Sequence, residues 1–450
     1  MSSTQQPKTA KSSDATIHNV SPTFLVRLWL LAFLVRLIGV ALGHLVIPHW
    51  LVPPDAHGAY YPIAQSLASG EGYTINGDAL DASRVAPGFP VWLAGLMMIG
   101  GTDLSTWFVG VFNAALRAGG VVILFLLANR CFGRNSAWWA ACLYLIDPWE
   151  TFWVGIVLKG GLAVPLFLLA IWLISKTRDY PVWQWAWATG AAIGVAGLTR
   201  FPSLILWPVA GLLLVLAVRT KNTHTRYGLG RASLIFLQIT LAMLVTLSPW
   251  LIRNRQVTGQ PILSTHFAGR YFYTSNGPGV EMVKDGYNDP DGINQEMLDK
   301  EDRTKPPVQR EVDLFTRTLG HVLSHPQELG QRLLTRLRNT WQPTFPDSSL
   351  RNWFLLALPY CVLLTLSLLG IGIAFYKRIP CSILLIPLLA MVLAHMVFWG
   401  EIRNRQYMMP MLYAFGGLTV HFAIRWRTTC KPELPTAETV EESVPLEKSK

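Results

Sequence analysis

Charged side chains are scarce in this sequence. Only 14% of its 450 residues are Asp, Glu, Lys or Arg, while 51% are hydrophobic. Soluble globular domains carry about 25% charged residues. The shortage therefore excludes an ordinary soluble protein and favours a chain that crosses a membrane several times.

Cysteine is also scarce, with five residues in the whole chain. They lie at positions 131, 142, 361, 381 and 430, outside the two long polar connections, so no disulfide framework is expected. No Cys/His spacing typical of a zinc site occurs, and we expect the cysteines to pack as small apolar residues. The first twenty residues are polar and no cleavage site follows the first apolar run, so a signal peptide is not expected.

Ten apolar segments follow one another along the chain. Because about 20 helical residues suffice to cross a bilayer, we predict an all-α polytopic membrane protein with about ten transmembrane helices and two outer loops. The segments are 24–47, 105–128, 135–150, 160–176, 184–199, 201–218, 232–251, 352–376, 380–400 and 407–425.

The net charge of +11 is distributed unevenly. Lys and Arg concentrate in alternate short connections, such as 129–134, 219–231 and 377–378. Cytoplasmic loops are enriched in these residues, so we expect a multi-pass protein of the cell membrane with both termini in the cytoplasm. This placement beside apolar segments makes membrane lipids the expected partner of the basic residues and argues against nucleic acid.

Two long polar connections divide the membrane part of the chain. The predicted regions are a disordered cytoplasmic N-terminus (1–22), an N-terminal membrane module (23–252) with a first outer loop (48–104), a large outer loop (253–351), C-terminal membrane helices (352–426) and a disordered cytoplasmic tail (427–450). The tails are assigned from their polar composition.

Asp55 lies immediately beyond the first apolar run, on the side opposite to the N-terminus. A carboxylate at the mouth of a membrane helix is well placed for acid/base chemistry near lipid headgroups. The alternative is that Asp55 only caps the short helix that follows it.

Four stretches resemble a known family in the same order. The first joins Pro54-Asp55, Tyr60 and Gly70-Glu-Gly-Tyr73 to Arg84 and Pro87-Gly-Phe-Pro90. The others are Ser248-Pro-Trp250 with Arg253-Asn254, then Ser324-His-Pro326 through Arg336–Trp341, and finally Glu401, Arg403, Arg405, Tyr407 and Pro410. They resemble GT-C-type glycosyltransferases of the bacterial protein O-mannosyltransferase and aminoarabinose-transferase superfamily, which is glycosyltransferase family thirty-nine in the broad sense.

The resemblance implies a GT-C architecture and a glycosyltransferase that uses a polyprenyl-phosphate sugar donor at the outer face of the membrane. In that family the acidic residue of the first loop is catalytic, and Asp55 holds the matching position. An inverting transfer needs a base for the proton of the acceptor hydroxyl, and a carboxylate can supply it. The sequence specifies neither the sugar, a hexose or a pentose, nor the acceptor, which is a protein, a lipid or a glycan.

The leaving group of such a transfer is a phosphate, which arginine and lysine bind. Cations at the outer helix ends are therefore candidate substrate-binding residues, with lipid headgroup contacts and structural ion pairs as the alternatives. Arg200 and Arg403 are favoured, because Arg200 stands between two apolar runs with little loop around it. The full set is Arg84, Lys159, Arg200, Arg253, Arg403 and Arg405, and the resemblance adds Tyr407.

Two features depart from the family pattern. Relatives often carry a second acidic residue near the start of the fourth helix, where this chain has Lys159, although Asp147 and Glu150 lie upstream and are candidate substitutes. Tyr60 follows Asp55 one place later than in some relatives. No metal ligand is assigned, and the need for a divalent metal cofactor stays open.

A flippase or permease for lipid-linked sugars is the competing hypothesis. Arg36 and Arg117 fall within predicted spans, where charges are costly and face protein or water. They would line a path in a transporter, but we expect ion pairs between helices or backbone contacts instead. Transporters often show two related halves, which this sequence lacks. An amphipathic run, Gln309–Trp341, interrupted at His325-Pro326, is expected to cover the mouth of the membrane domain.

Overall fold

The computed structural model describes residues 20–220, 227–265, 268–278, 304–344, 349–398 and 400–429. Across these ranges the chain is helical, and apart from an isolated bridge between Ile75 and Asp78 it contains no strand. The predicted all-α class is therefore confirmed. Most of both predicted disordered tails and the acidic middle of the second loop lie outside the described residues, so the region boundaries stay predictions.

Six of the described helices are long and apolar enough to cross a membrane. Most of the exposed side chains on α1, such as Leu34 and Ile38, are apolar, as expected for a helix that faces lipid. The six are α1 (Pro22–Val46), α5 (Thr106–Phe132), α8 (Gly160–Asp179), η3 with α10 (Phe201–Ile205, Leu206–Thr220), α11 (Leu229–Thr258) and the run of α16, η4 and α17 (Leu350–Asn352, Trp353–Ala357, Leu358–Tyr376).

The predicted number of ten membrane helices is not confirmed. The remaining four segments form helices that are shorter or less apolar, namely α6 (Arg134–Ile146), α9 (Trp183–Thr199), α18 (Ser382–Val397) and α19 (Met409–Thr429). The segment expected at 135–150 is divided, because α6 ends at Ile146 and α7 (Pro148–Val154) begins. Asp147 caps α7, where its carboxylate accepts from the Trp149 N–H at 3.1 Å.

Small residues bring the helices of the bundle close together. Helix α1 packs on α5, α5 packs on α6 and α8, and α9 packs on both α8 and α11. A Cβ atom at Gly190 of α9 would lie 2.2 Å from the carbonyl oxygen of Ile239 in α11. Glycine at this position therefore allows the two backbones to approach as closely as they do.

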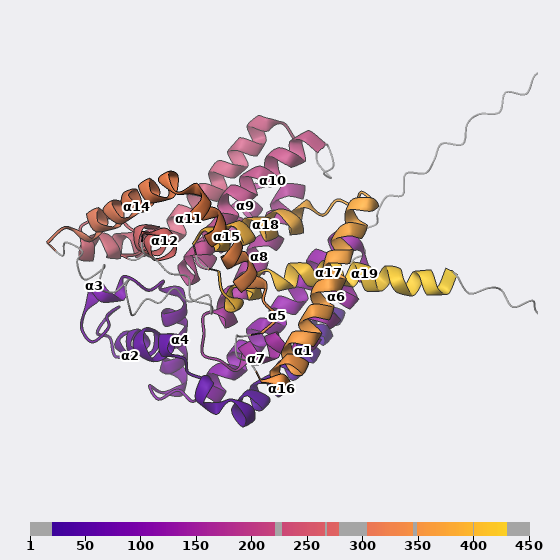
Figure 1. The fold of residues 1–450 in the computed structure, drawn as a ribbon, viewed down its shortest axis with the longest axis horizontal. Coiled ribbons are helices and arrows are strands. Elements are labelled where there is room, and N and C mark those ends of the chain that lie inside the picture. Colours follow the sequence, from indigo (N-terminus) through magenta and orange to yellow (C-terminus); the bar gives the residue numbers. More distant parts are fainter. Residues whose placement is uncertain are drawn as a thin grey trace, which may run out of the picture.

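Most of the short helices of the polar connections gather at one end of the bundle, toward the left in Figure 1, which we call the loop-bearing end. The first connection forms η1 (Pro48–Trp50), η2 (Ala56–Tyr60), α2 (Tyr61–Ala68), α3 (Ala79–Ala82) and α4 (Gly88–Gly100). The second forms α12 (Ala268–Asn276), α14 (Pro307–Ser324) and α15 (Pro326–Trp341), and η5 (Ile402–Tyr407) joins α18 to α19.

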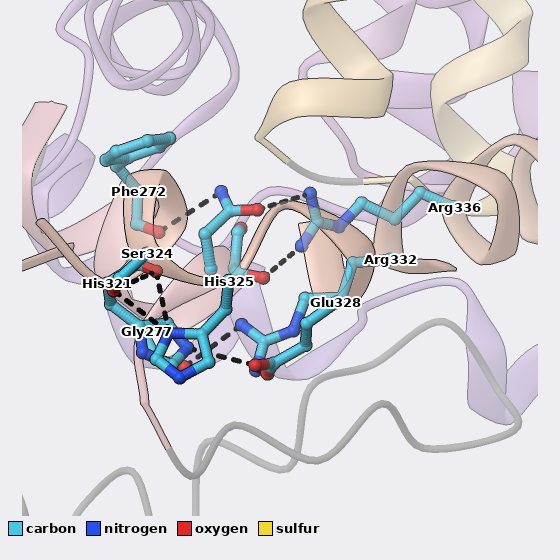
Figure 2. Close-up of polar contacts among 10 residues, drawn as sticks. Phe272, Gly277, His321, Ser324, His325, Glu328, Arg332 and Arg336 are labelled. Atoms are coloured by element: carbon cyan, nitrogen blue, oxygen red, sulfur yellow. Dashed lines mark hydrogen bonds and ion pairs between the residues drawn. The ribbon is translucent and has the colours of Figure 1, made fainter. Parts of the chain in front are cut away.

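Two arginines of α15 hold the C-terminal end of α12 (Figure 2). The Arg332 guanidinium donates to the carbonyl oxygen of Gly277 at 3.0 Å. Arg336 donates to the side chain of Asn276 at 3.0 Å and to the carbonyl oxygen of Val397 in α18, also at 3.0 Å. Burial lowers the pKa of Arg336 to about 10. These donors satisfy carbonyls that a helix end leaves without partners, and they fasten the second connection to the membrane bundle.

The two arginines within predicted spans contact protein groups, as expected. Arg36 is fully buried and donates to the carbonyl oxygen of Tyr144 at 2.6 Å. Arg117, with a side chain that is 1% exposed, forms an ion pair with Glu150. Each charge therefore links helices rather than facing lipid.

Candidate active site

Asp55 does not cap the helix that follows it. It precedes η2, yet its side chain makes no capping hydrogen bond there. Instead, its carboxylate accepts from Nη1 of Arg403 at 3.0 Å, and the Asp55 side chain is 46% exposed. The capping alternative is thus wrong in this structure, and the carboxylate is accessible to a substrate.

A π-helical turn places Tyr60 on the same side as Asp55. The N–H of Tyr61 bonds to the carbonyl oxygen of Ala56, five residues earlier. Such a turn brings residues five apart onto one face and often marks a functional site. A π-helical turn also contains one residue more than an α-helical turn. It therefore accommodates the position of Tyr60, which follows Asp55 one place later than in some relatives. The pKa of Tyr60 is raised, first by burial and then by the Asp55 carboxylate, so its hydroxyl stays protonated.

Arg403 connects two carboxylates at the loop-bearing end. Besides Asp55, it contacts Glu401, whose Oε1 lies 2.5 Å from Nε of Arg403. The Glu401 side chain is only 8% exposed, whereas that of Arg403 is 28% exposed. The buried carboxylate of Glu401 therefore fixes one edge of the Arg403 guanidinium, and the edge that contacts Asp55 remains accessible.

Arg200 reaches the same turn from the end of α9. Its guanidinium donates to Oδ1 of Asn404 at 2.5 Å and lies 4.4 Å from the ring centre of Tyr407. It also lies 3.3 Å from Nε2 of His395 in α18. The planar fork of arginine is suited to such combined stacking and hydrogen bonding.

Gly88 explains how the first connection reaches Arg200. Helix α4 begins at Gly88, where a Cβ atom would lie 2.6 Å from Oγ1 of Thr199. Glycine is therefore required for this close approach of α4 to the end of α9. The Pro87-Gly-Phe-Pro90 motif thus packs the first loop against the residue that precedes Arg200.

Lys159 completes the cationic group. The N–H of Val157 bonds to the carbonyl oxygen of Leu51 at 2.8 Å, which ties the segment before α8 to the chain that leads to Asp55. Among the described residues, none forms a hydrogen bond or ion pair with the Lys159 ammonium. Its pKa is lowered to about 8, mainly by burial and then by Arg200 and Arg403, while Asp55 and Glu401 oppose the shift. Lys159, Arg200, Arg403, Asp55 and Glu401 therefore lie close enough to influence one another electrostatically.

The other predicted binding residues are engaged by other groups of the protein. Arg84 pairs with Asp81 at 2.8 Å, and its side chain is 36% exposed. Arg253 donates to the carbonyl oxygens of Tyr73 and Ala79, each at 2.7 Å. These contacts give both arginines a structural partner, and their role in substrate binding stays a prediction.

Arg405 points away from Asp55 although it is only two residues from Arg403. It is buried, donates to the carbonyl oxygen of Gln342, and lies 4.5 Å from the ring centre of Trp149 and 3.9 Å from that of Tyr360. Tyr407 is fully buried below Arg200. A direct substrate contact for either residue stays a prediction.

Sequence reasoning did not select Asn404 or His395. Asn404 stands between two arginines that were selected, and His395 is a polar residue near the end of an otherwise apolar stretch of α18. The position of His395 could have indicated a functional residue, because polar groups within apolar helices are often functional.

The two acids considered as substitutes for a second carboxylate are both engaged in the bundle. Asp147 accepts a hydrogen bond from the Tyr413 hydroxyl, and Glu150 pairs with Arg117. In the part of the chain that the structure describes, no group of three or more His, Cys, Asp or Glu side chains is arranged to hold a metal ion. The polar groups that surround Asp55 are therefore mainly cationic.

Comparisons with known proteins agree with the architecture. Residues 84–252 match the family model described as dolichyl-phosphate-mannose-protein mannosyltransferase. The apo oligosaccharyltransferase from Archaeoglobus fulgidus superposes with a TM-score of 0.54 at 14% identity, covering 91% of this chain and 52% of that one. The chain thus spans about half the length of that enzyme. A search of curated proteins found no match.

A second solved structure covers more of its own length. ArnT from Cupriavidus metallidurans, bound to undecaprenyl phosphate, matches with a TM-score of 0.44 at 18% identity, over 92% of this chain and 82% of that one. The matched family segment contains Arg84, Lys159 and Arg200. The fold and the family match together confirm that this all-α membrane protein resembles the GT-C-type membrane glycosyltransferases, as its sequence predicts.

Proposed function

We propose that the protein transfers a sugar from a polyprenyl-phosphate donor to an acceptor at the outer face of the cell membrane. The observation that carries this proposal is the meeting of one accessible carboxylate, Asp55, with three cations, Lys159, Arg200 and Arg403. The description of the family matched by residues 84–252 supports the same donor class.

Asp55 acts as the base in this reaction. It accepts the proton of the acceptor hydroxyl as the acceptor oxygen forms a bond to the anomeric carbon of the sugar. The bond between that carbon and the phosphate oxygen breaks, and its electron pair leaves with the polyprenyl phosphate. Attack from the side opposite to the phosphate inverts the configuration.

The three cations stabilise the phosphate as negative charge develops on it. Lys159 contributes an ammonium without a protein partner among the described residues, and Arg200 and Arg403 contribute planar donors held by Asn404 and Glu401. Arg403 contacts Asp55 as well, so it links the base to the leaving group. Fixed donors of this kind need no rearrangement when the reaction occurs.

The membrane location follows from the donor. The isoprenoid chain of the donor stays among the lipid tails. The protein must therefore bind the phosphate at the membrane surface, where the membrane helices end. The distribution of Lys and Arg supports an orientation with the loop-bearing end outside the cell.

The proposal is tested with purified protein in proteoliposomes. Native mass spectrometry with undecaprenyl phosphate should show binding to the parent and weaker binding to Lys159→Ala. A panel of undecaprenyl-phosphate hexoses and pentoses, presented with membrane acceptors, should include one that the parent converts to undecaprenyl phosphate. Failure of every donor, together with no accumulation of lipid-linked sugars in cells that lack the protein, would overturn the proposed activity.

A further inference from the structure

A charged network inside the bundle ends at the proposed phosphate site. Arg117 of α5 forms its ion pair with Glu150 of α7 through one terminal nitrogen. Its other terminal nitrogen, Nη2, donates to Oε1 of Gln406 at 3.0 Å. The two nitrogens of one rigid fork therefore hold an acid and an amide in a fixed relation.

Gln406 connects Arg117 to the backbone of Arg403. Its Nε2 donates to the carbonyl oxygen of Arg403 at 2.8 Å, within the same turn, η5. Both ends of the amide are thus occupied, one by a membrane helix and the other by the backbone that carries the cation. An amide bonded at both ends cannot turn without losing two hydrogen bonds in a buried place, which is costly.

The same amide lies directly against the segment that carries Lys159. A Cβ atom at Gly160 would lie 2.2 Å from Oε1 of Gln406. Gly161 approaches the amide of Asn113 in the same manner, at 2.4 Å, and Asn113 stands one turn before Arg117 on α5. The start of α8 is therefore fitted against two side chains that α5 positions.

Stability alone does not account for a charged pair in this place. Buried ion pairs are often no more stabilising than well-packed apolar residues, because both charges must be taken out of water. An apolar residue at position 117 would fill space but would leave Gln406 free to rotate. We therefore attribute the charge of Arg117 to the orientation that it imposes on the Gln406 amide.

We propose that Gln406, held by Arg117 and Glu150, is a positioning residue that fixes Arg403 relative to Lys159 so that both cations meet one phosphate. The inference rests on the phosphate site proposed above. It adds that residues buried in the bundle, which touch no substrate, set the geometry of that site.

The experiment compares four variants of the full-length protein in proteoliposomes. They are Gln406→Ala, Gly160→Ala, the double variant of these two, and Gly119→Ala as a matched control. A Cβ at Gly119 meets no atom within 4 Å, although this residue lies on α5 beside Arg117. We expect Gln406→Ala to lower the transfer rate by roughly 10²-fold, as a displacement of about 1 Å does in other enzymes, and the control to match the parent.

The titration of Lys159 provides a readout that does not depend on transfer. Its rate of acetylation by acetic anhydride, followed by mass spectrometry across pH, should titrate at about pH 8 in the parent. In Gln406→Ala, Arg403 is no longer fixed near Lys159, so its share in lowering the pKa of Lys159 should fall and the ammonium should titrate at a higher pH. A purely structural loss would lower the yield of folded protein without moving this titration in the protein that remains.

The double variant tests the contact itself. If the methyl group at position 160 acts by pushing the Gln406 amide, the double variant should transfer no more slowly than Gln406→Ala alone. Multiplying losses, or an unchanged Lys159 titration in both single variants, would overturn the positioning role. A shifted titration in a protein that transfers no sugar from any polyprenyl phosphate would support the positioning role and refute the proposed activity.

Discussion

Oδ2 of Asp55 lies 3.0 Å from Nη1 of Arg403, although the two residues are 348 positions apart in the chain. The pair joins the residue that follows the first membrane helix to the turn that precedes the last helix, α19. The first and last parts of the bundle therefore meet at this contact. A site assembled in this way depends on the whole membrane domain being folded.

The first prediction concerns Asp55. Replacement by Asn should lower sugar transfer by about 10²- to 10⁴-fold, because the amide cannot accept the acceptor's proton. The amount of folded protein should not change, since Asp55 is 46% exposed and caps no helix. Asp103→Asn, at an exposed acid near the start of α5, is the control. Near-normal turnover of Asp55→Asn would remove the catalytic role.

Arg200 and Arg403 should respond to the shape of the cation as well as its charge. We expect Arg→Lys to weaken transfer at either position and Arg→Ala to lower it by about 10²-fold, because a planar donor to the developing charge is lost. Single-turnover rates at matched levels of folded protein measure this. If both alanine variants transfer at the parent rate, neither residue binds the phosphate.

The binding of undecaprenyl phosphate should weaken as the pH rises from 7 to 9. The pKa of Lys159 is lowered to about 8 by burial and by Arg200 and Arg403. The ammonium is therefore charged below pH 8 and neutral above it, and only the charged form attracts phosphate. Affinity measured across this range should become less dependent on pH in Lys159→Met. An equal pH dependence in parent and variant would assign the titration to another group.

Arg253 should act on stability more than on binding. It bonds to the backbone of the first connection at Tyr73 and Ala79 and stacks near Trp250 at 5.1 Å. Arg253→Ala should lower the free energy of unfolding by about 1–3 kcal/mol, since two partly buried carbonyl acceptors lose their donor. Arg255→Ala is the control, because Arg255 is exposed and lies two residues later on the same helix. Thermal unfolding in detergent compares the two, and an equal Tm would contradict this role.

The orientation in the membrane is tested by labelling single cysteines. On a background without the five native cysteines, Cys is introduced at the exposed positions Asp103 or Lys377. An impermeant thiol reagent applied to intact cells should label position 103 and not position 377, because the basic connections face the cytoplasm. The reverse pattern would invert the topology.

Much of the fold could be predicted from the sequence, because long apolar runs in a chain with few charges have no other stable arrangement than membrane helices. The break at His325-Pro326 was also predictable, since proline begins a helix more readily than it continues one. The number of membrane-spanning helices was harder to predict. The Asp147-Pro148 step divides a segment that hydropathy alone reads as continuous.

The site was predicted in part. Outer-end cations were recognised, yet nothing in the spacing separated Arg403 from Arg405. The two lie on a 3₁₀ turn with three residues per turn, so neighbours two apart face different directions. One faces Asp55 and the other is buried against Trp149 and Tyr360. Sequence reasoning favoured Arg403 but kept Arg405 among the candidates, because without knowledge of the turn type it could not assign the two side chains to different directions.

Turn η5 has a consequence for how such a protein evolves. Successive residues of the turn contact partners in different parts of the chain: Arg403 contacts Asp55, Asn404 contacts Arg200, Arg405 contacts Gln342, and Gln406 contacts Arg117. Inserting or deleting one residue here would rotate the following side chains by about 120° and break these contacts together. Homologous chains should therefore vary in length on either side of this turn and not within it, and these four pairs should change in concert.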